Sequence, residues 1–333
     1  MTTSIAPAAA AHLLKSTVLV VDSDKKQLRA LERILKSAVG KVEARETMGA
    51  MPDDGAFDLI ALSYDTLDAA ARPELIRALA DRQRTRLLLF SGGAWVSDHK
   101  ELFGGRVLTN LLAKNGEEVG AEDLIVTINK ILTADIFGIE KYFTWGAGVA
   151  AIATTSSTEK DGIADKARDF ARNLGVNDRL ATYFASVTDE LLTNALYNAP
   201  VDEHGKHMFA SRDRSQAVEL PADKAVQVKL CSDGRKIGVS IADPFGSLTV
   251  DSVLDYLAKC FRKEDDQIDT KPGGAGLGLF QAFGSVSHLV INISPGVRCE
   301  AIGMIDVRGS FKDFARQAKS FNIFVTEGTT HGR

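Results

Sequence analysis

Cysteine is scarce in this sequence, and the cysteines that occur do not form a metal-binding pattern. The 333 residues include only three, Cys231, Cys260 and Cys299. An odd number without metal-ligand spacing predicts free thiols, because disulfide frameworks use paired cysteines and belong to oxidising compartments. We therefore expect a reducing, cytoplasmic environment.

Three further features are missing. Basic residues are not in excess, since the net charge is −4, and this argues against a general nucleic-acid-binding surface. Glu140 and Lys141 interrupt the apolar stretch 136–155, so no membrane-spanning helix is predicted. The apolar N-terminal segment has no basic residues ahead of it, unlike a signal peptide, and we expect residues 1–15 to be a loose tail.

The length and the 45% hydrophobic content are sufficient for two packed domains, and we expect a two-domain α/β protein. In residues 16–134, helical patterns separate short apolar runs, namely TVLVV at 17–21, FDLIAL at 57–62 and RLLLF at 86–90. This alternation predicts a parallel sheet covered by helices on both faces. Residues 135–147 form an aromatic linker that we expect to be packed, and residues 148–333 form the second domain.

The first domain resembles a response-regulator receiver domain, which implies a flavodoxin-like, doubly wound parallel sheet. Asp22 matches the first acid of the receiver's acidic pair. Ser23 stands where the second acid would be, with Asp24 beyond it. Ser91 and Lys114 match the switch hydroxyl and the lysine of the family.

The position of the receiver's phosphorylated aspartate is occupied by Ser63. A serine cannot form an acyl phosphate, so we interpret the domain as a pseudo-receiver that keeps the fold for docking or dimerising. The alternative is receiver chemistry through Asp65, two residues further along the chain.

A polar stripe marks residues 188–199, which read TDELLTNALYNA. Glu190, Asn194 and Asn198 recur every four residues, and on a helix this spacing places them along one face. A carboxylate can orient or deprotonate a nucleophile. An amide oxygen one turn further on is a suitable ligand for Mg²⁺. The alternative is an ordinary solvent-exposed polar face.

Two later stretches favour the functional interpretation. Residues 241–248 read IADPFGSL, an apolar strand that ends in Asp243 and runs into a glycine turn at Gly246. Residues 271–280 read KPGGAGLGLF, a glycine-rich loop that leads into an apolar helix. Backbone N–H groups at such a helix start are suited to binding phosphate oxygens.

Together the three stretches resemble the nucleotide-binding boxes of the GHKL ATPase family, which includes histidine-kinase catalytic domains, gyrase B, MutL and the anti-sigma serine kinases. The resemblance implies a Bergerat-type α/β sandwich that binds ATP and Mg²⁺. It implies that Glu190 is the general base, Asn194 the Mg²⁺ ligand and Asp243 the acceptor for the adenine amino group. The remaining candidates for nucleotide binding are Asn198, Gly246, Lys271, Gly274, Gly276, Leu277 and Gly278.

The second box departs from the family pattern. The family has DxGxG where this chain has Asp243, Pro244, Phe245, Gly246 and Ser247. A phenylalanine and a serine in place of glycines are expected to narrow or reshape the adenine pocket.

Autophosphorylating histidine kinases are excluded by the placement of the histidines. None of the six lies on an amphipathic helix before residue 150 with an acidic neighbour. Three functions remain open: a Ser/Thr kinase or partner-switching regulator of the anti-sigma type, a nucleotide-gated binding module without appreciable catalysis, and a scaffold without nucleotide. The resemblances imply a bacterial signalling protein that acts on protein partners, with a homodimer as one option, and not on nucleic acid or membranes.

Overall fold

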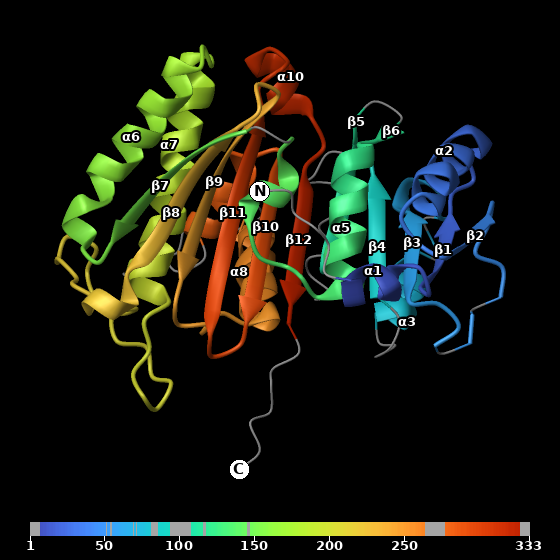
Figure 1. The fold of residues 1–333 in the computed structure, drawn as a ribbon, viewed down its shortest axis with the longest axis horizontal. Helices are drawn as coiled ribbons and strands as arrows, with labels where there is room; N and C mark the ends of the chain where they lie inside the picture. The colour runs from blue at the N-terminus through green and yellow to red at the C-terminus, as the bar shows by residue number, and fades with distance from the viewer. Residues whose placement is uncertain are drawn as a thin grey trace. The chain divides into compact units, whose positions relative to one another are not determined.

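The computed structural model describes residues 7–50, 52–53, 55–68, 70, 72–80, 86–93, 108–115, 118–144, 147–263 and 277–326. The chain forms two compact units, each of the α/β type (Figure 1). Unit 1 comprises Met1–Ile136 and Ser320–Phe324, and unit 2 comprises Phe137–Lys319 and Val325–Arg333. Within the described residues, no helix has the length and apolar character required to cross a membrane.

Unit 1 is built on a sheet with the strand order β2-β1-β3-β4-β5-β12. Strands β1 to β5 pair in parallel, as predicted from their alternation with helices. The strands are β1 (Thr17–Val21), β2 (Lys41–Arg45), β3 (Leu59–Ser63), β4 (Arg86–Ser91), β5 (Asn110–Asn115), β12 (Ser320–Val325) and the short β6 (Glu118–Val119), which pairs with β5. The helices are α1 (Pro7–Leu13), α2 (Lys25–Lys36), α3 (Arg72–Ala80) and α5 (Ala121–Thr133).

Local sequence explains how unit 1 positions its polar residues. All five residues of β3 are buried, which is typical of a parallel strand covered on both faces. Helix α2 begins after Asp24, whose carboxylate accepts the N–H groups of Lys26 and Gln27 and so caps the helix. Asp22 directly follows β1, and Ser63 is the last residue of β3. Because β1 and β3 pair in parallel, their carboxyl ends lie together and bring these two residues to the same edge of the sheet.

The N-terminal segment differs from the predicted loose tail of residues 1–15. Pro7–Leu13 form helix α1, which contacts α5. Leu13 is buried, and its carbonyl oxygen accepts a hydrogen bond of 3.0 Å from the Gly40 N–H. Alanine is the best helix former, and the buried leucine anchors the alanine run against the unit. The prediction is therefore wrong for residues 7–13.

The end of the chain returns to unit 1. In β12, Phe321 lies opposite Leu111 and Asn322 opposite Asn110, in antiparallel register. The buried Asn322 side chain donates a hydrogen bond of 3.0 Å to Asn110, which is 212 residues away in sequence. The sequence predicts residues 320–324 to be part of the second domain, 148–333, because pairing over such a distance leaves no local pattern. The structure corrects that boundary.

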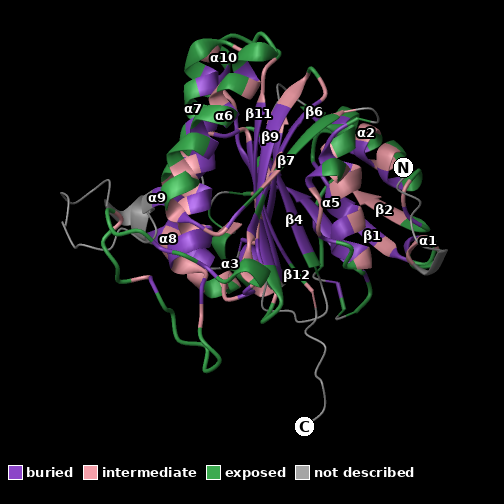
Figure 2. Ribbon diagram, turned by 60° about the vertical axis from the view of Figure 1, so that its left-hand side comes forward, coloured by how far each residue is buried: buried purple, intermediate pink, exposed green. Residues whose placement is uncertain are grey.

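Unit 2 contains antiparallel strands in the order β10-β11-β9-β8-β7, together with five α-helices among its described residues. Its strands are β7 (Gly148–Thr154), β8 (Val226–Ser232), β9 (Lys236–Asp243), β10 (His288–Ser294) and β11 (Arg298–Asp306). Its helices are α6 (Lys160–Asn173), α7 (Asp178–Thr193), α8 (Val250–Lys263), α9 (Leu277–Gly284) and α10 (Phe311–Arg316). Helices α6 to α9 lie on one side of the sheet (Figure 2). Strands β8 to β11 are largely buried, whereas the edge strand β7 is mostly exposed.

The aromatic linker packs onto unit 2. The Gly138 N–H donates a hydrogen bond of 2.9 Å to the buried Glu300 carboxylate on β11. Gly238 on β9 leaves space for the Phe143 ring, since a Cβ atom there would lie 2.7 Å from it. Residues 137–144 of the predicted linker therefore pack on unit 2, while Trp145 lies outside the described residues.

Candidate functional site

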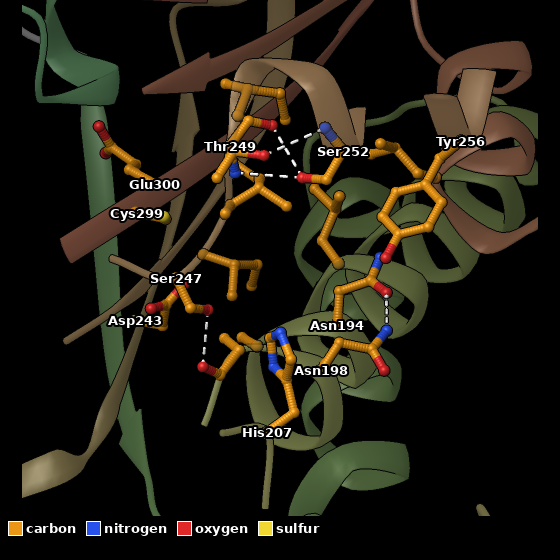
Figure 3. A pocket seen from close by; sticks show the side chains of 18 residues that line it. Asn194, Asn198, His207, Asp243, Ser247, Thr249, Ser252, Tyr256, Cys299 and Glu300 are labelled. Atoms are coloured by element: carbon orange, nitrogen blue, oxygen red, sulfur yellow. Dashed lines mark hydrogen bonds between the residues drawn. The ribbon is translucent and has the colours of Figure 1, made fainter. Parts of the chain in front are cut away.

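A cavity of about 250 Å³ lies in unit 2 between the helical layer and the sheet (Figure 3). Helices α7, α8 and α9 and strands β9, β10 and β11 contribute residues to its walls. The apolar part of the lining is formed by Leu191, Ile241, Leu248, Leu279 and Ile291. Apolar walls with a few convergent polar groups are typical of sites for small organic ligands.

On the sheet side, the cavity is lined by Cys299, Glu300 and Asp243. The predicted site residue among them is Asp243. It ends β9, where the antiparallel register pairs it with Cys299 on β11. Its side chain is 8% exposed, and its carboxylate accepts the Phe245 N–H at 3.0 Å. Burial raises the pKa of Asp243 to about 6, although the backbone N–H donors of Phe245 and Gly246 oppose the change.

Asn194 and Asn198 form the facing wall on the helical side. Helix α7 ends at Thr193, and residues Asn194–Asn198 continue it as one π-helical turn. The Asn198 Nδ2 group donates a hydrogen bond of 2.7 Å to Asn194 Oδ1. The predicted four-residue spacing therefore does bring these amides together, but on a wider turn than an α-helix.

Glu190 lies one turn earlier on α7, against the start of α9. Burial raises the pKa of Glu190 above its ordinary value, and the neighbouring Asp189 carboxylate raises it further. The positive charges of Lys160 and Arg214 act in the opposite direction. A Cβ atom on Gly278 would lie 2.1 Å from Glu190 Oε2, so the glycine allows α9 to approach the carboxylate.

The predicted glycine box is described only from Leu277, where α9 begins. Lys271, Gly274 and Gly276 lie outside the described residues. Of the candidates in this box, the structure therefore places Gly278 beside the site and leaves the phosphate-binding role of the others as a prediction.

The substitutions in the second box do not fill the cavity. Phe245 is buried but is not among the lining residues, and Lys224 lies over its ring at 5.9 Å. Ser247 lines the cavity and donates a hydrogen bond of 2.7 Å to the Ala199 carbonyl. The expected narrowing of the pocket by the phenylalanine is therefore not observed.

Gly246 has a packing role. It has a φ of +61°, and a Cβ atom there would lie 2.4 Å from the Ser294 carbonyl oxygen. Its own carbonyl accepts the Gly296 N–H at 2.9 Å. Gly246 does not line the cavity and instead holds the turn after β9 against the β10–β11 hairpin.

Several polar residues at or near the cavity are not among the predicted site residues. Arg214 donates a hydrogen bond of 2.9 Å to Asn198 Oδ1, and the lining includes His207, Thr249, Ser252, Tyr256, Cys299 and Glu300. His207 and Arg214 belong to the polar segment 200–222, whose composition resembles an ordinary surface loop. No local signal distinguishes them, because their position depends on how the segment folds back onto α7.

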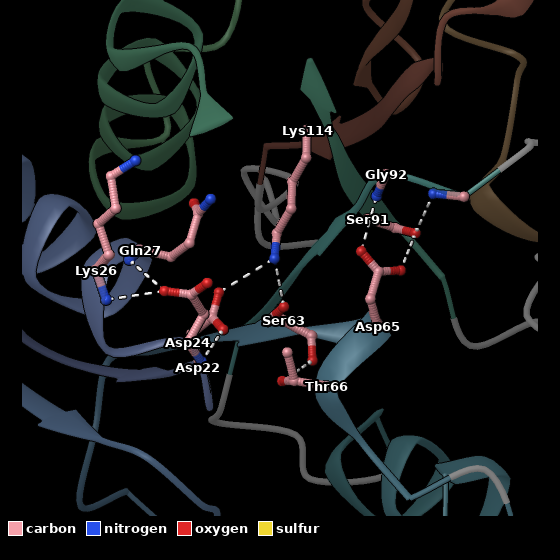
Figure 4. A network of polar contacts seen from close by, with 11 residues as sticks. Asp22, Asp24, Lys26, Gln27, Ser63, Asp65, Thr66, Ser91, Gly92 and Lys114 are labelled. Carbon is pink, nitrogen blue, oxygen red and sulfur yellow. Dashed lines mark hydrogen bonds and ion pairs between the residues drawn. The ribbon is translucent and has the colours of Figure 1, made fainter. Parts of the chain in front are cut away.

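The receiver-like residues of unit 1 also converge (Figure 4). Lys114 Nζ lies 2.6 Å from Ser63 Oγ and 3.1 Å from Asp22 Oδ2. Ser63 and Asp22 are fully buried. Asp24 is not part of this cluster, since its carboxylate caps α2.

Asp65 occupies a different place, beside the Ser91 hydroxyl. Ser91 Oγ donates to Asp65 Oδ1 at 2.6 Å, and the Gly92 N–H donates to Asp65 Oδ2 at 2.8 Å. The carboxylate of Asp65 is thus engaged by two donors of its own unit. Lys114, the lysine of the receiver pattern, contacts Ser63.

A bound Mg²⁺ would require additional ligands beyond protein carboxylates. In the described part of the chain, no group of three or more His, Cys, Asp or Glu residues could hold a metal ion. The Asn194 amide oxygen fits the preference of Mg²⁺ for oxygen ligands, and Mg²⁺ commonly takes its remaining ligands from substrate phosphates and water.

Comparison of the sequence with models of known protein families finds no match. Comparison with curated proteins finds no relative with significant similarity.

Proposed function

We propose that unit 2 binds ATP with Mg²⁺ in a GHKL-type site and acts on a protein partner in bacterial signalling. The adenine would lie against Asp243, and the phosphates would extend toward Asn194 and the start of α9. The protein would be a Ser/Thr kinase or a partner-switching regulator of the anti-sigma type, located in the cytoplasm.

The observation that carries this proposal is the placement of Asp243. A buried carboxylate that faces an apolar cavity costs free energy unless a ligand donates hydrogen bonds to it. The adenine amino group is such a donor, and a planar base suits the apolar walls. The oxygen of Asn194 on the facing wall gives a nucleotide with a metal-bound phosphate chain a second point of attachment.

Glu190 is the proposed general base. Its pKa is raised toward neutral pH, and a general base is most effective when its pKa lies near the pH at which the enzyme works. Phosphoryl transfer depends mainly on positioning and electrostatics, so one base, one metal ligand and a phosphate-binding helix start form a sufficient set.

A nucleotide-gated binding module is the second candidate, and one observation favours it. Glu190 does not line the cavity, because it faces α9 at Gly278. A site in this arrangement would hold ATP and exchange partners without rapid transfer.

The fate of the γ-phosphate distinguishes the two candidates. The full chain would be incubated with γ-labelled ATP, Mg²⁺ and co-purified proteins. Label on a partner supports the kinase, labelled inorganic phosphate supports an ATPase, and binding without either supports the gated module. Glu190→Gln should abolish transfer while preserving binding. Glu203→Gln, at an exposed position, is the matched control.

For unit 1 we propose a flavodoxin-like pseudo-receiver that serves docking or dimerisation. The parallel order β2-β1-β3-β4-β5 supports this, since it is the order of doubly wound flavodoxin-like sheets. The Ser63–Lys114 contact at the acceptor position supports the absence of acyl-phosphate chemistry.

A further inference from the structure

Arg214 is connected to the proposed metal ligand through two hydrogen bonds. Its Nη2 group donates to Asn198 Oδ1 at 2.9 Å, and Asn198 Nδ2 donates to Asn194 Oδ1 at 2.7 Å. The arginine comes from the segment between the π turn and β8, and therefore lies outside the helix that carries both amides.

The π turn itself holds this arginine in place. The guanidinium carbon lies 4.6 Å from the centre of the buried Tyr197 ring. The Tyr197 hydroxyl donates to the backbone carbonyls of Arg214 at 3.2 Å and Gln216 at 2.9 Å. Stacking and backbone anchoring therefore fix the guanidinium beside Asn198.

The chemistry of the donors determines the orientation of both amides. An amide side chain has an oxygen end and a nitrogen end of nearly equal shape, whereas a guanidinium can only donate. Arg214 therefore requires the oxygen of Asn198, which turns the Asn198 nitrogen toward Asn194. Asn194 must then accept the hydrogen bond from Asn198 with its side-chain oxygen. Without Arg214, both amides could reverse and Asn194 would present its NH₂ group, which cannot bind a cation.

The charge of Arg214 also fits the site. Burial lowers the pKa of Arg214, whereas Tyr197 and Glu190 raise it, so the cation lies within electrostatic range of the proposed base. Its Nη1 atom is buried and has no hydrogen-bond partner among the described residues. A buried donor of this kind favours an anionic ligand such as a phosphate oxygen.

We propose that Arg214 is a positioning residue that sets the orientation of the Asn198–Asn194 pair, so that the Mg²⁺-dependent part of nucleotide binding depends on it. This inference rests on the proposed function of unit 2. It adds a residue from the polar segment to the metal site and assigns its effect to the metal rather than to the adenine.

The test uses the full chain with Arg214→Met, which keeps an apolar stem against Tyr197 and removes every donor. Arg212→Met is the matched control, because Arg212 is exposed and its guanidinium lies over Phe209. The first readout is the NMR signal of the Asn198 side-chain amide, labelled with ¹⁵N-asparagine. The second is the ratio of ATP affinities with and without Mg²⁺.

Arg214→Met should shift the Asn198 amide signal and accelerate its proton exchange, and should lower the Mg²⁺-dependent affinity ratio roughly tenfold, as expected for loss of a charge-assisted hydrogen bond. Arg212→Met should change neither. An unchanged Asn198 signal or an unchanged ratio in folded Arg214→Met protein overturns the inference. Failure of the wild type to bind ATP refutes the proposed function instead, and the amide signal still decides whether Arg214 orients the pair.

Discussion

Asp243 is the residue in which function and stability conflict most clearly. Its carboxylate is buried in an apolar wall, and the N–H groups of Phe245 and Gly246 compensate only part of the lost hydration. A ligand that donates a hydrogen bond would recover more of this cost. Asp243 is therefore expected to lower the folding stability of the ligand-free protein and to increase its affinity for the ligand.

The pH dependence of stability tests this conflict. Because folding raises the pKa of Asp243 from 3.8 to about 6, the folded protein holds the proton more tightly than the unfolded chain. The stability that this group contributes is fully present below about pH 4 and is lost as the pH rises through 6. Asp243→Asn should therefore increase the free energy of unfolding at pH 7–8 by up to about 3 kcal/mol, with no gain below pH 4.

Urea unfolding of the ligand-free protein at several pH values measures this effect. Asp233→Asn is a control of opposite sign. Burial would raise the pKa of Asp233, but the N–H groups of Arg235, Lys236 and Thr144 outweigh burial and lower it. That variant should be less stable than wild type at neutral pH. A loss of stability in Asp243→Asn at pH 8 would show that the carboxylate is stabilised by contacts other than those described.

Ser63 and Asp65 lead to a prediction about phosphodonors. Acetyl phosphate should leave unit 1 unmodified, because Ser63 cannot form an acyl phosphate and Asp65 is engaged by Ser91 and Gly92. Intact-mass measurement checks this. A hydroxylamine-labile mass increase would mean that Asp65 is phosphorylated and that the pseudo-receiver interpretation is wrong. An acid-stable increase would indicate an ester on Ser63.

At the level of elements, the junction of α7 and α9 connects two of the predicted boxes. Gly278 brings α9 onto the Glu190 carboxylate, and a methyl group there would force the side chain to move. The start of α9 and the proposed base, Glu190, are thus positioned by the same contact.

Gly278→Ala should therefore displace Glu190 and lower the rate of γ-phosphate transfer roughly hundredfold, the lower end of what a positioned base contributes. ATP affinity should fall much less than the transfer rate, because Asp243 and Asn194 are not displaced. Single-turnover assays and binding measurements separate the two effects. Gly162→Ala on α6 is the control, since no atom lies within 4 Å of a Cβ atom there. An unaltered transfer rate in Gly278→Ala would remove Glu190 from the base role.

Strand β12 comes from the last part of the sequence and pairs with β5 in the sheet of unit 1. Phe321 is fully buried, so Phe321→Ala should destabilise the protein by about 3–5 kcal/mol and release the amides of β5 to hydrogen exchange. Val325→Ala, at an exposed position of the same strand, should have little effect. Undiminished protection of β5 in Phe321→Ala would show that β12 does not support this sheet.

For the molecule as a whole, the sequence predicted features that depend on local pattern. The buried run of β3, the spacing of Glu190, Asn194 and Asn198, and the strand-end position of Asp243 all follow from periodicity and from how strands end. Ser63 and Lys114 were singled out by the resemblance to receiver domains, and the structure brings them into contact because parallel strands end at one edge of a sheet.

Features that depend on distant contacts could not be predicted. The pairing of β12 with β5 joins segments on opposite sides of unit 2 in sequence, and the hydrogen bond from Arg214 requires a polar segment to fold back onto α7. The π turn depends on one extra residue in a helix, which leaves the polar spacing nearly unchanged. Such features are set by packing rather than by local propensity.

The central claim, that unit 2 is an ATP site read by Asp243, is tested most directly by calorimetry on the full chain. Wild type should bind ATP in preference to GTP, and Mg²⁺ should strengthen the binding. Asp243→Asn should bind ATP roughly ten- to a hundredfold more weakly, as expected for loss of a charge-assisted hydrogen bond, with the fold intact. Equal ATP affinity in wild type and folded Asp243→Asn protein, or no binding to either, would contradict the account.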